Sequence, residues 1–302
     1  MAGETNRLER ELRPRPEIPI VGTYTLVYAS KGLYCLTMSG VHKTSYGYTA
    51  FLNEPWIHGL NAIPTELAKQ WGSDGIFVKA MLLGPTNNRR LVQLVCETDP
   101  QVSPVFLAQR LKGRLQYALK QESALFPGFT RDFHLISLGG NDRTIVSDYI
   151  REQVNHSDLV DPLYRKRMND LRFEQVPSSP PSGKHKGIHD LALHVVFVIA
   201  GRARMFSNEA RTVADALLQA VSESSGTVHG FSIMPDHAHL LIRPNHHLSP
   251  QETIKSIREA SHKKLRRTAF WQQGGYTGTV GPYRLEVALR KTKERGGWVC
   301  CF

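Results

Sequence analysis

Two histidines in the stretch IMPDHAHLLIRP (residues 233–244) are the first residues of this chain whose spacing suggests chemistry. His237 and His239 lie two residues apart inside an otherwise apolar run. Because side chains alternate between the two faces of a strand, both imidazoles share one face, with Cα atoms about 6.5–7 Å apart. At that spacing both can bind one metal ion. The alternative is a pair of ordinary histidines on a half-exposed strand, so the surrounding sequence has to decide.

Composition narrows the class of protein. The chain has 302 residues, 41% of them hydrophobic, which is enough for two domains with a core each. No apolar run approaches the ~20 residues of a membrane span, and we expect a cytoplasmic protein with no membrane partner. The net charge of +11 favours nucleic acid as the partner. Neither a zinc finger nor a disulfide framework is suggested by the four cysteines, Cys35, Cys96, Cys300 and Cys301.

A linker divides the chain. Residues 174–187 (EQVPSSPPSGKHKG) concentrate Pro, Ser, Gly and Lys without periodicity, which is typical of a flexible connection. Residues 161–173 (DPLYRKRMNDLRF) lead into it and predict a short basic helix outside either core. We therefore expect a disordered basic segment over 1–17, a first domain over 18–156, a linker over 157–187 and a second domain over 188–302.

The two domains repeat one pattern. Residues 102–121 and 248–267 both have a hydrophobe, a Ser-Pro helix start and an amphipathic basic helix. A strand precedes each helix at the same distance along the chain, from Arg90 and from Asp236. Upstream, residues 22–30 and 191–201 predict the first strands, and 207–226 a helix. The order β-α-β-β-α-β predicts an α+β protein made of two ferredoxin-like units, with antiparallel sheets and helices on one face.

The second half resembles a known family. MPDHAHLLI, followed by LSP, a basic helix, FWQQGGYTGTVG and a terminal helix, is similar to the single-tyrosine HUH transposases, which include IS200-like and REP-associated tyrosine transposases. The resemblance covers residues 188–296 well and residues 18–156 more weakly. It implies a ferredoxin-like fold and cleavage of single-stranded DNA with hairpin ends. A tyrosine on the last helix forms a 5′-phosphotyrosine, and the histidine pair with a glutamine one turn after the tyrosine holds Mg²⁺ or Mn²⁺.

The chain departs from this family in each half. In the second half, Lys291 stands where the tyrosine is expected and Arg295 where the glutamine is expected. That half has the metal ligands and no nucleophile at the matching position. A rival nucleophile, Tyr283, lies about two turns away at the start of the same helix.

The first half departs in the opposite way. The offset that relates the two Ser-Pro helices places Leu91 and Gln93 opposite the two histidines. However, SDYIREQ supplies Tyr149 and, four residues later, Gln153, on one face of a helix. Matching Tyr149 to Lys291 shortens the offset and requires a gap of four positions before the last helix.

The two departures complement each other. Family dimers exchange their terminal helices, so the same exchange within this chain would unite Tyr149 and Gln153 with the histidine pair. Leu91, Gln93, Lys291 and Arg295 would then form an inactive counterpart. We therefore expect a fused pseudo-dimer with one composite site, which can self-associate further. The alternative is that both halves are broken copies and Tyr149 is only an aromatic residue on a helix face.

The basic residues of the two long helices are candidates for binding DNA phosphates, although each one alone is better explained as a solvated surface charge. Trp271 and Tyr276 follow the second helix and can stack on unpaired bases, with a core role as the alternative for Trp271. The candidates are Lys255, Arg258, Lys263, Lys264, Arg266 and Arg267 in the second half, and Arg110, Lys112, Arg114 and Lys120 in the first.

Three functions fit these features. The favoured one is a metal-dependent enzyme that cleaves and transfers single-stranded DNA, either in DNA transposition or in a domesticated derivative. The second is a catalytically silent protein that binds hairpin or single-stranded DNA. The third is a metal-dependent hydrolase with a water nucleophile, against which the Tyr149 and Gln153 pair argues.

Overall fold

A computed structural model describes residues 44–56, 63–83, 91–155, 161–174 and 187–300. The segment 1–17 and residues 22–30 lie outside the described residues. The prediction that 22–30 form the first strand of the first unit is wrong, because Thr44–Leu52 occupies that place in the sheet. All of the described residues belong to one compact unit. Among the described residues, no helix combines the length and apolar character needed to cross a bilayer.

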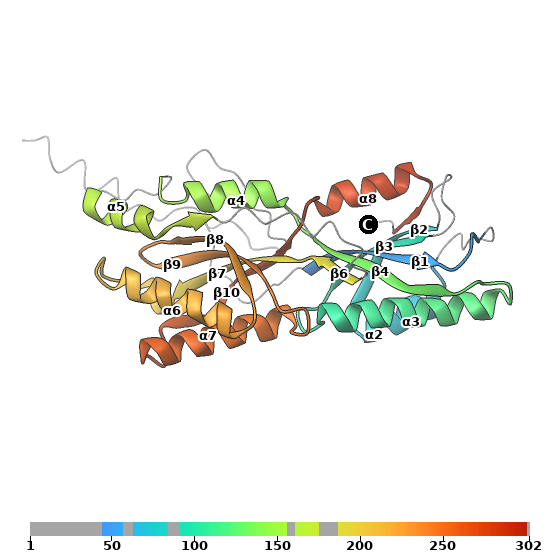
Figure 1. The fold of residues 1–302 in the computed structure, drawn as a ribbon, viewed down its shortest axis with the longest axis horizontal. Coiled ribbons are helices and arrows are strands. Elements are labelled where there is room, and N and C mark those ends of the chain that lie inside the picture. Colours follow the sequence, from blue (N-terminus) through green and yellow to red (C-terminus); the bar gives the residue numbers. More distant parts are fainter. Residues whose placement is uncertain (1–43, 57–62, 84–90, 156–160, 175–186, 301–302) are drawn as a thin grey trace, which may run out of the picture. The chain divides into compact units, whose positions relative to one another are not determined.

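The first half is a ferredoxin-like unit, as predicted. Its strands follow the order β2-β3-β1-β4 with antiparallel neighbours, which is the strand arrangement of that fold. The helices α2 and α3 cover one face of the sheet (Figure 1). The elements are β1 (Thr44–Leu52), α2 (Thr65–Ser73), β2 (Ile76–Leu83), β3 (Leu91–Thr98), α3 (Pro104–Glu122) and β4 (Phe129–Leu138).

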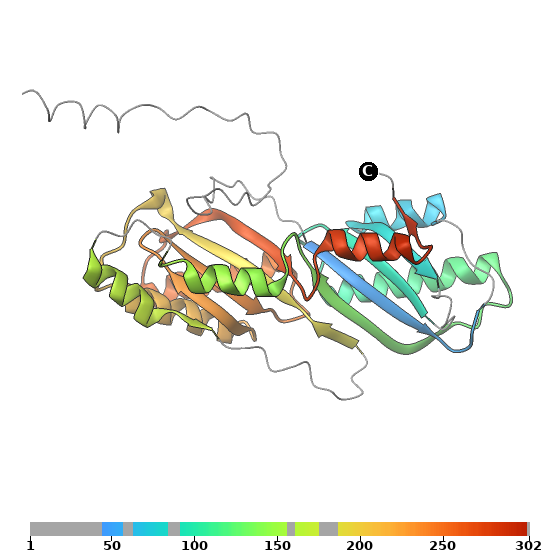
Figure 2. The ribbon, with the colours of Figure 1, turned by 90° about the horizontal axis from the view of Figure 1, so that it is seen from above.

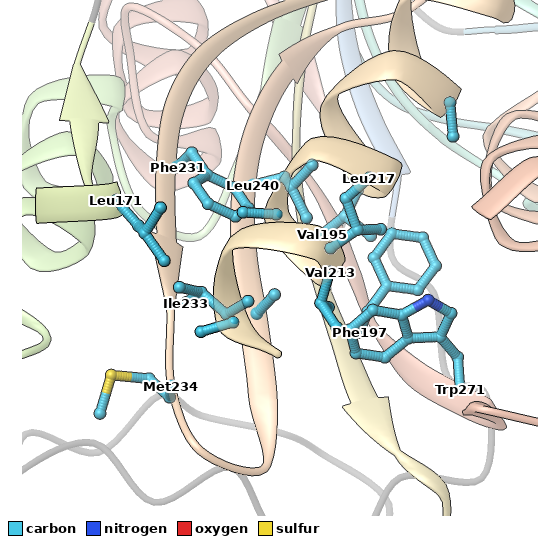
Figure 3. Close-up of a cluster of buried hydrophobic side chains, with 14 of the residues drawn as sticks. Leu171, Val195, Phe197, Val213, Leu217, Phe231, Ile233, Met234, Leu240 and Trp271 are labelled. Carbon is cyan, nitrogen blue, oxygen red and sulfur yellow. The ribbon is translucent and has the colours of Figure 1, made fainter. Parts of the chain in front are cut away.

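The second half repeats this arrangement with the order β10-β7-β9-β8. Its helices α6 and α7 pack on one face, where Phe197, Phe231, Leu240 and Trp271 form the centre of the core (Figure 3). The prediction of an α+β protein with two ferredoxin-like units is therefore confirmed. The elements are β7 (Ala192–Ile199), α6 (Ala210–Glu223), β8 (Thr227–Ile233), β9 (His237–Arg243), α7 (Pro250–Leu265) and β10 (Trp271–Val280), with a 3-10 turn at Ala200–Arg202.

The Ser-Pro motifs begin the long helices as predicted. Ser103 accepts a hydrogen bond from Phe106 N at the start of α3, and Ser249 forms a capping box with Glu252 at the start of α7. The starts of α3 and α7 are separated by the same number of residues as the Ser-Pro motifs. The starts of β4 and β10 are separated by the smaller number that relates Tyr149 to Lys291. The gap between the halves therefore lies between the long helix and the last strand, where α3 is longer than α7.

The terminal helices are exchanged between the halves. Helix α4 (Arg143–Glu152) packs on β8 and β9 of the second half, and α8 (Leu285–Glu294) packs on β2 and β3 of the first (Figures 1 and 2). Each helix covers the sheet face opposite to the two helices of that unit (Figure 1). The described part of the chain therefore has the helix arrangement that the family resemblance implied for a dimer.

The two chain crossings are related by a pseudo-twofold symmetry. Arg143 N donates to Gly281 O at 2.9 Å, and Leu285 N donates to Gly139 O at 2.8 Å. Arg143 and Leu285 occupy equivalent positions in the repeat, and so do Gly139 and Gly281. The contact is therefore isologous, as in a symmetric dimer. A Cβ atom at Gly281 would lie 1.8 Å from Ser137 O, and one at Gly139 would lie 2.2 Å from Thr279 O.

Gly281→Ala and Gly139→Ala are therefore expected to destabilise the protein, each by at least about 1–3 kcal/mol, because backbone atoms must move to admit the methyl group. Gly140→Ala is the matched control, since nothing lies within 4 Å of its Cβ position. Urea unfolding followed by circular dichroism measures the differences. Equal stability of the three variants would contradict the tight crossing.

The expected linker contains ordered structure. Helix α5 (Pro162–Leu171) forms as predicted, and β5 (Phe173–Glu174) pairs with β8. Met168 and Leu171 are buried in the core of the second half, so the expectation that this helix lies outside either core is wrong. The reason is their spacing of three positions, which places both on one face of an otherwise basic helix.

Two short strands at or beyond the expected domain boundary at residue 188 belong to the sheet of the first half. Strand β6 (Gly187–Asp190) pairs in parallel with β4, and β11 (Trp298–Val299) pairs with β2, so both extend the first sheet. The division of the sequence into two consecutive domains therefore differs from the division of the structure into two sheets.

Candidate active site

The histidine pair lies on β9, on the sheet face covered by α4. The two side chains share this face, as strand periodicity predicts, and their ring centroids are 4.9 Å apart. His239 is buried, whereas the side chain of His237 is 18% exposed. One imidazole is therefore enclosed in the protein, while its neighbour is partly exposed to solvent.

Each histidine is held through its Nδ1 atom. His237 Nδ1 lies 2.6 Å from Asp236 Oδ1, and His239 Nδ1 lies 3.1 Å from Nε2 of His194 on the neighbouring strand β7. Burial raises the pKa of Asp236, but its hydrogen bond with His237 and the charges of His237 and Arg202 outweigh burial, so the net pKa falls. Contacts at Nδ1 leave the Nε2 atoms as the ring nitrogens that can bind an ion.

Burial keeps the inner histidines neutral. It lowers the pKa of His194 to about 4. The pKa of His239 falls well below its ordinary value, first through burial and then through the nearby His237 and His194. A neutral imidazole is the form that binds a metal. His194 was missed in the sequence, although it is the one polar residue inside the apolar run LALHVVFVI.

Helix α4 brings Tyr149 of the first half to this site. The helix is capped by Asp142, whose side chain accepts from Ile145 N, and it buries Val146 and Ile150. The ring of Tyr149 lies 5.3 Å from that of His239, centroid to centroid. Because one helical turn advances about 5.4 Å, Gln153 follows one turn beyond Tyr149.

Three buried polar atoms from three elements are without hydrogen-bond partners here. They are His239 Nε2 on β9, Gln153 Oε1 at the end of α4 and the hydroxyl of Ser232 on β8, none of which has a partner among the described residues. Ser232 is directly opposite His239 in the strand register. A buried polar atom without a partner calls for an explanation, and a bound ion or water is one such explanation. Among the described residues, no group of three His, Cys, Asp or Glu side chains is placed to hold a metal.

The expected inactive counterpart lies on the first half's sheet. Leu91 and Gln93 are on β3, Lys291 is on α8 and Arg295 follows the end of that helix. Lys291 lies over the ring of Tyr283, with its Nζ 5.3 Å from the ring centroid. Tyr283 therefore lies beside the helix that covers the first half's sheet, whereas the histidine pair lies on the second half's sheet.

Most of the predicted phosphate-binding residues contact protein groups. Arg114 and Arg110 lie 2.7 and 3.6 Å from Asp74, and Arg258 donates to Gln273 O. Lys112 donates to Thr130 O, and burial lowers its pKa. Carboxylates also lie near Lys255 (Glu259, 4.0 Å), Lys264 (Glu223, 2.6 Å) and Arg267 (Glu209, 2.5 Å), whereas Lys120, Lys263 and Arg266 are exposed on the surface.

The assignment of Trp271 to DNA binding is wrong. Its side chain is only 2% exposed, and its indole N–H donates to Ser261 Oγ at 3.1 Å inside the second core. A ring enclosed in this way has no face available for a nucleobase. Tyr276 is half-buried on the other sheet face, 5.2 Å from the ring of His194.

A basic cleft adjoins the histidine strand. It has a volume of about 600 Å³ and lies between residues 199–209 and residues 266–270. Met205 N donates to Pro235 O, which ties one wall to the turn before His237. Phe206 is 74% exposed, and Arg204 and Arg266 also line the cleft. Sequence reasoning missed Phe206, because the segment 200–206 has no periodicity.

Comparisons with known proteins relate part of the chain to one family. Residues 187–290 match the family model described as "Transposase IS200 like". One similar solved structure is "a putative transposase from deinococcus radiodurans r1", 16% identical, which covers 38% of this chain and 97% of its own, with a TM-score of 0.30. A mutant chlorite dismutase from Candidatus Nitrospira defluvii is 13% identical over 82% of this chain and 94% of its own, with a TM-score of 0.22. No curated protein matched the sequence.

Proposed function

We propose, from the premise that residues 187–290 match the IS200-like transposase family, that this chain cleaves single-stranded DNA and transfers the cut strand through Tyr149. The observation that carries the proposal is the position of Tyr149. The first half supplies this tyrosine on an exchanged helix, 5.3 Å from the ring of His239 in the second half. Tyr149 therefore comes from one half of the chain and the histidine pair from the other.

The residues around Tyr149 fit a divalent metal. His237 and His239 would bind it through Nε2, and Gln153 through Oε1. Two of these atoms, His239 Nε2 and Gln153 Oε1, are buried without hydrogen-bond partners in the described part of the chain. When bound, Mg²⁺ or Mn²⁺ neutralises charge on the scissile phosphate, and imidazole ligands shift the preference toward Mn²⁺.

Tyr149 acts as the nucleophile in this proposal. Its phenol loses its proton to solvent and its oxygen bonds to phosphorus, while the bond from phosphorus to the 3′ oxygen breaks and that oxygen takes up a proton from solvent to leave as a 3′-hydroxyl. The 5′ end stays attached to Tyr149 as a phosphotyrosine. Because the new ester retains the bond energy, a second 3′-hydroxyl can displace Tyr149 and rejoin the strand without ATP.

The basic cleft supports single-stranded DNA as the substrate. Unpaired bases stack on exposed aromatic rings, and Phe206 offers such a ring. The exposed Arg266 stands on the other wall and can contact the phosphate backbone. The hydrogen bond from Met205 N to Pro235 O ties the wall that carries Phe206 to the turn before His237, which connects the cleft to the histidine strand.

A catalytically silent DNA-binding protein is the second candidate. The counterpart site on the first sheet favours it, because Lys291 and Arg295 have replaced the nucleophile and a metal ligand there. Such losses accompany repurposing of a transposase. The third candidate, a hydrolase with a water nucleophile, leaves the position of Tyr149 without a role.

Adduct formation tests the proposal. The full chain is incubated with Mn²⁺ and single-stranded oligonucleotides that together cover the DNA on both sides of its own gene, including any hairpins there. We expect a protein band that carries labelled DNA through a denaturing gel. If the protein binds the hairpins tightly and forms no adduct, the silent binding protein replaces the enzyme. If it releases cut DNA without forming an adduct, the protein is instead a hydrolase with a water nucleophile.

A further inference from the structure

His194 has no part in the reaction described above, yet it contacts a proposed metal ligand. It lies on β7, is 3% exposed, and its Nε2 atom is 3.1 Å from Nδ1 of His239. The two rings are nearly parallel, with an interplanar angle of 20° and centroids 5.4 Å apart. The contact joins two adjacent strands inside the protein.

When a metal is bound, only one of the two histidines can be the donor of this hydrogen bond. A bond between two ring nitrogens needs one N–H group and one lone pair. A metal at His239 Nε2 uses the lone pair of that atom, so the proton of the neutral His239 ring is on Nδ1. His194 Nε2 must then be the acceptor. The opposite arrangement, with His194 as donor, places a proton on His239 Nε2 and blocks the metal.

We propose that His194 is a positioning residue, which selects the metal-binding tautomer of His239 and fixes its ring. The inference rests on the metal site of the proposed function. Metal-binding histidines usually donate their second N–H to a carboxylate or a carbonyl, as His237 does toward Asp236. At His239 an imidazole takes that role.

The surroundings of His194 hold it in this role. Its ring centroid lies 5.2 Å from that of Tyr276 and 6.3 Å from that of Tyr149, so aromatic side chains from β10 and α4 limit its movement. Its Nε2 contacts the Nδ1 atom of His239, whereas the proposed metal faces the Nε2 atom on the other side of that ring. This geometry makes His194 a support for a ligand and not a ligand itself.

Mn²⁺ binding to the full chain, measured by calorimetry without DNA, tests this role. His194→Leu removes the acceptor and is expected to raise the Kd about 10–100-fold, the usual effect of losing an outer partner of a metal ligand. His194→Gln places an amide oxygen close to the former Nε2 position and is expected to restore the Kd to within a few-fold of wild type. His229→Leu, on β8 of the same sheet, is the control and should leave the Kd unchanged. Thermal unfolding without metal confirms that each variant is folded.

The other outcomes are distinct. If folded His194→Leu binds Mn²⁺ like the wild type, His194 has no positioning role, while the proposed function is unaffected. If His194→Gln loses as much affinity as His194→Leu, and the electron spin-echo signal of bound Mn²⁺ loses one coupled nitrogen, His194 is itself a ligand. If the wild-type protein binds no Mn²⁺, both the metal site of the proposed function and this inference are wrong.

Discussion

Tyr149→Phe is expected to abolish the covalent adduct between this protein and single-stranded DNA. The substitution removes only the phenol oxygen and keeps the ring that packs beside His239. Since no other group replaces the nucleophile, strand cleavage should fall by more than about 10³-fold, the scale seen when enzymes lose a covalent nucleophile. Denaturing gels measure the adduct, and anisotropy with labelled hairpin DNA should show unchanged binding.

Tyr283→Phe is the matched control for that experiment. Tyr283 is 52% exposed, precedes α8 and contacts Lys291 on the first half's side. Its substitution should leave both the adduct and the cleavage rate unchanged. If Tyr283→Phe removes the adduct and Tyr149→Phe does not, the composite site is assigned to the wrong helix.

His239→Ala is expected to weaken Mn²⁺ binding at least about 100-fold and to stop cleavage, because it removes a ligand of the ion that neutralises the charge building at the phosphate. The variant also leaves His194 Nε2 without its hydrogen bond, which costs about 1–3 kcal/mol of stability. His237→Ala separates the two effects. Its side chain is partly exposed, so it should lose Mn²⁺ affinity with little change in thermal unfolding.

Gln93→Ala is the pseudo-symmetric control, since Gln93 occupies the position of His239 in the first half. It should leave both Mn²⁺ affinity and cleavage at wild-type levels. Crystals soaked with Mn²⁺ give an independent readout. An ion between Leu91 and Lys291, or affinity that survives the loss of both histidines, would contradict a single metal site.

The sequence by itself determined the features that depend on local spacing. Helix starts follow from Ser-Pro, because the serine caps orphan N–H groups and proline fits the first turn. The shared face of His237 and His239 follows from strand periodicity. The repeat of one pattern in both halves predicted two ferredoxin-like units, and the opposite losses in the two halves predicted that their helices would be exchanged. The roles of Tyr149, Gln153 and the histidine pair stay predictions until the experiments above are done.

Tertiary structure alone decided which groups surround the site. His194 meets His239 only because β7 and β9 are neighbours in the sheet at a particular register, and a lone histidine in an apolar run does not reveal its partner. Trp271 and Met168 are core residues because apolar side chains from other elements pack around them, and the local sequence of each does not reveal those partners. The glycines at 139 and 281 acquired their importance where two distant strands cross at backbone contact. Such features depend on which segments contact each other in the folded protein, and helix and strand propensities do not predict those contacts.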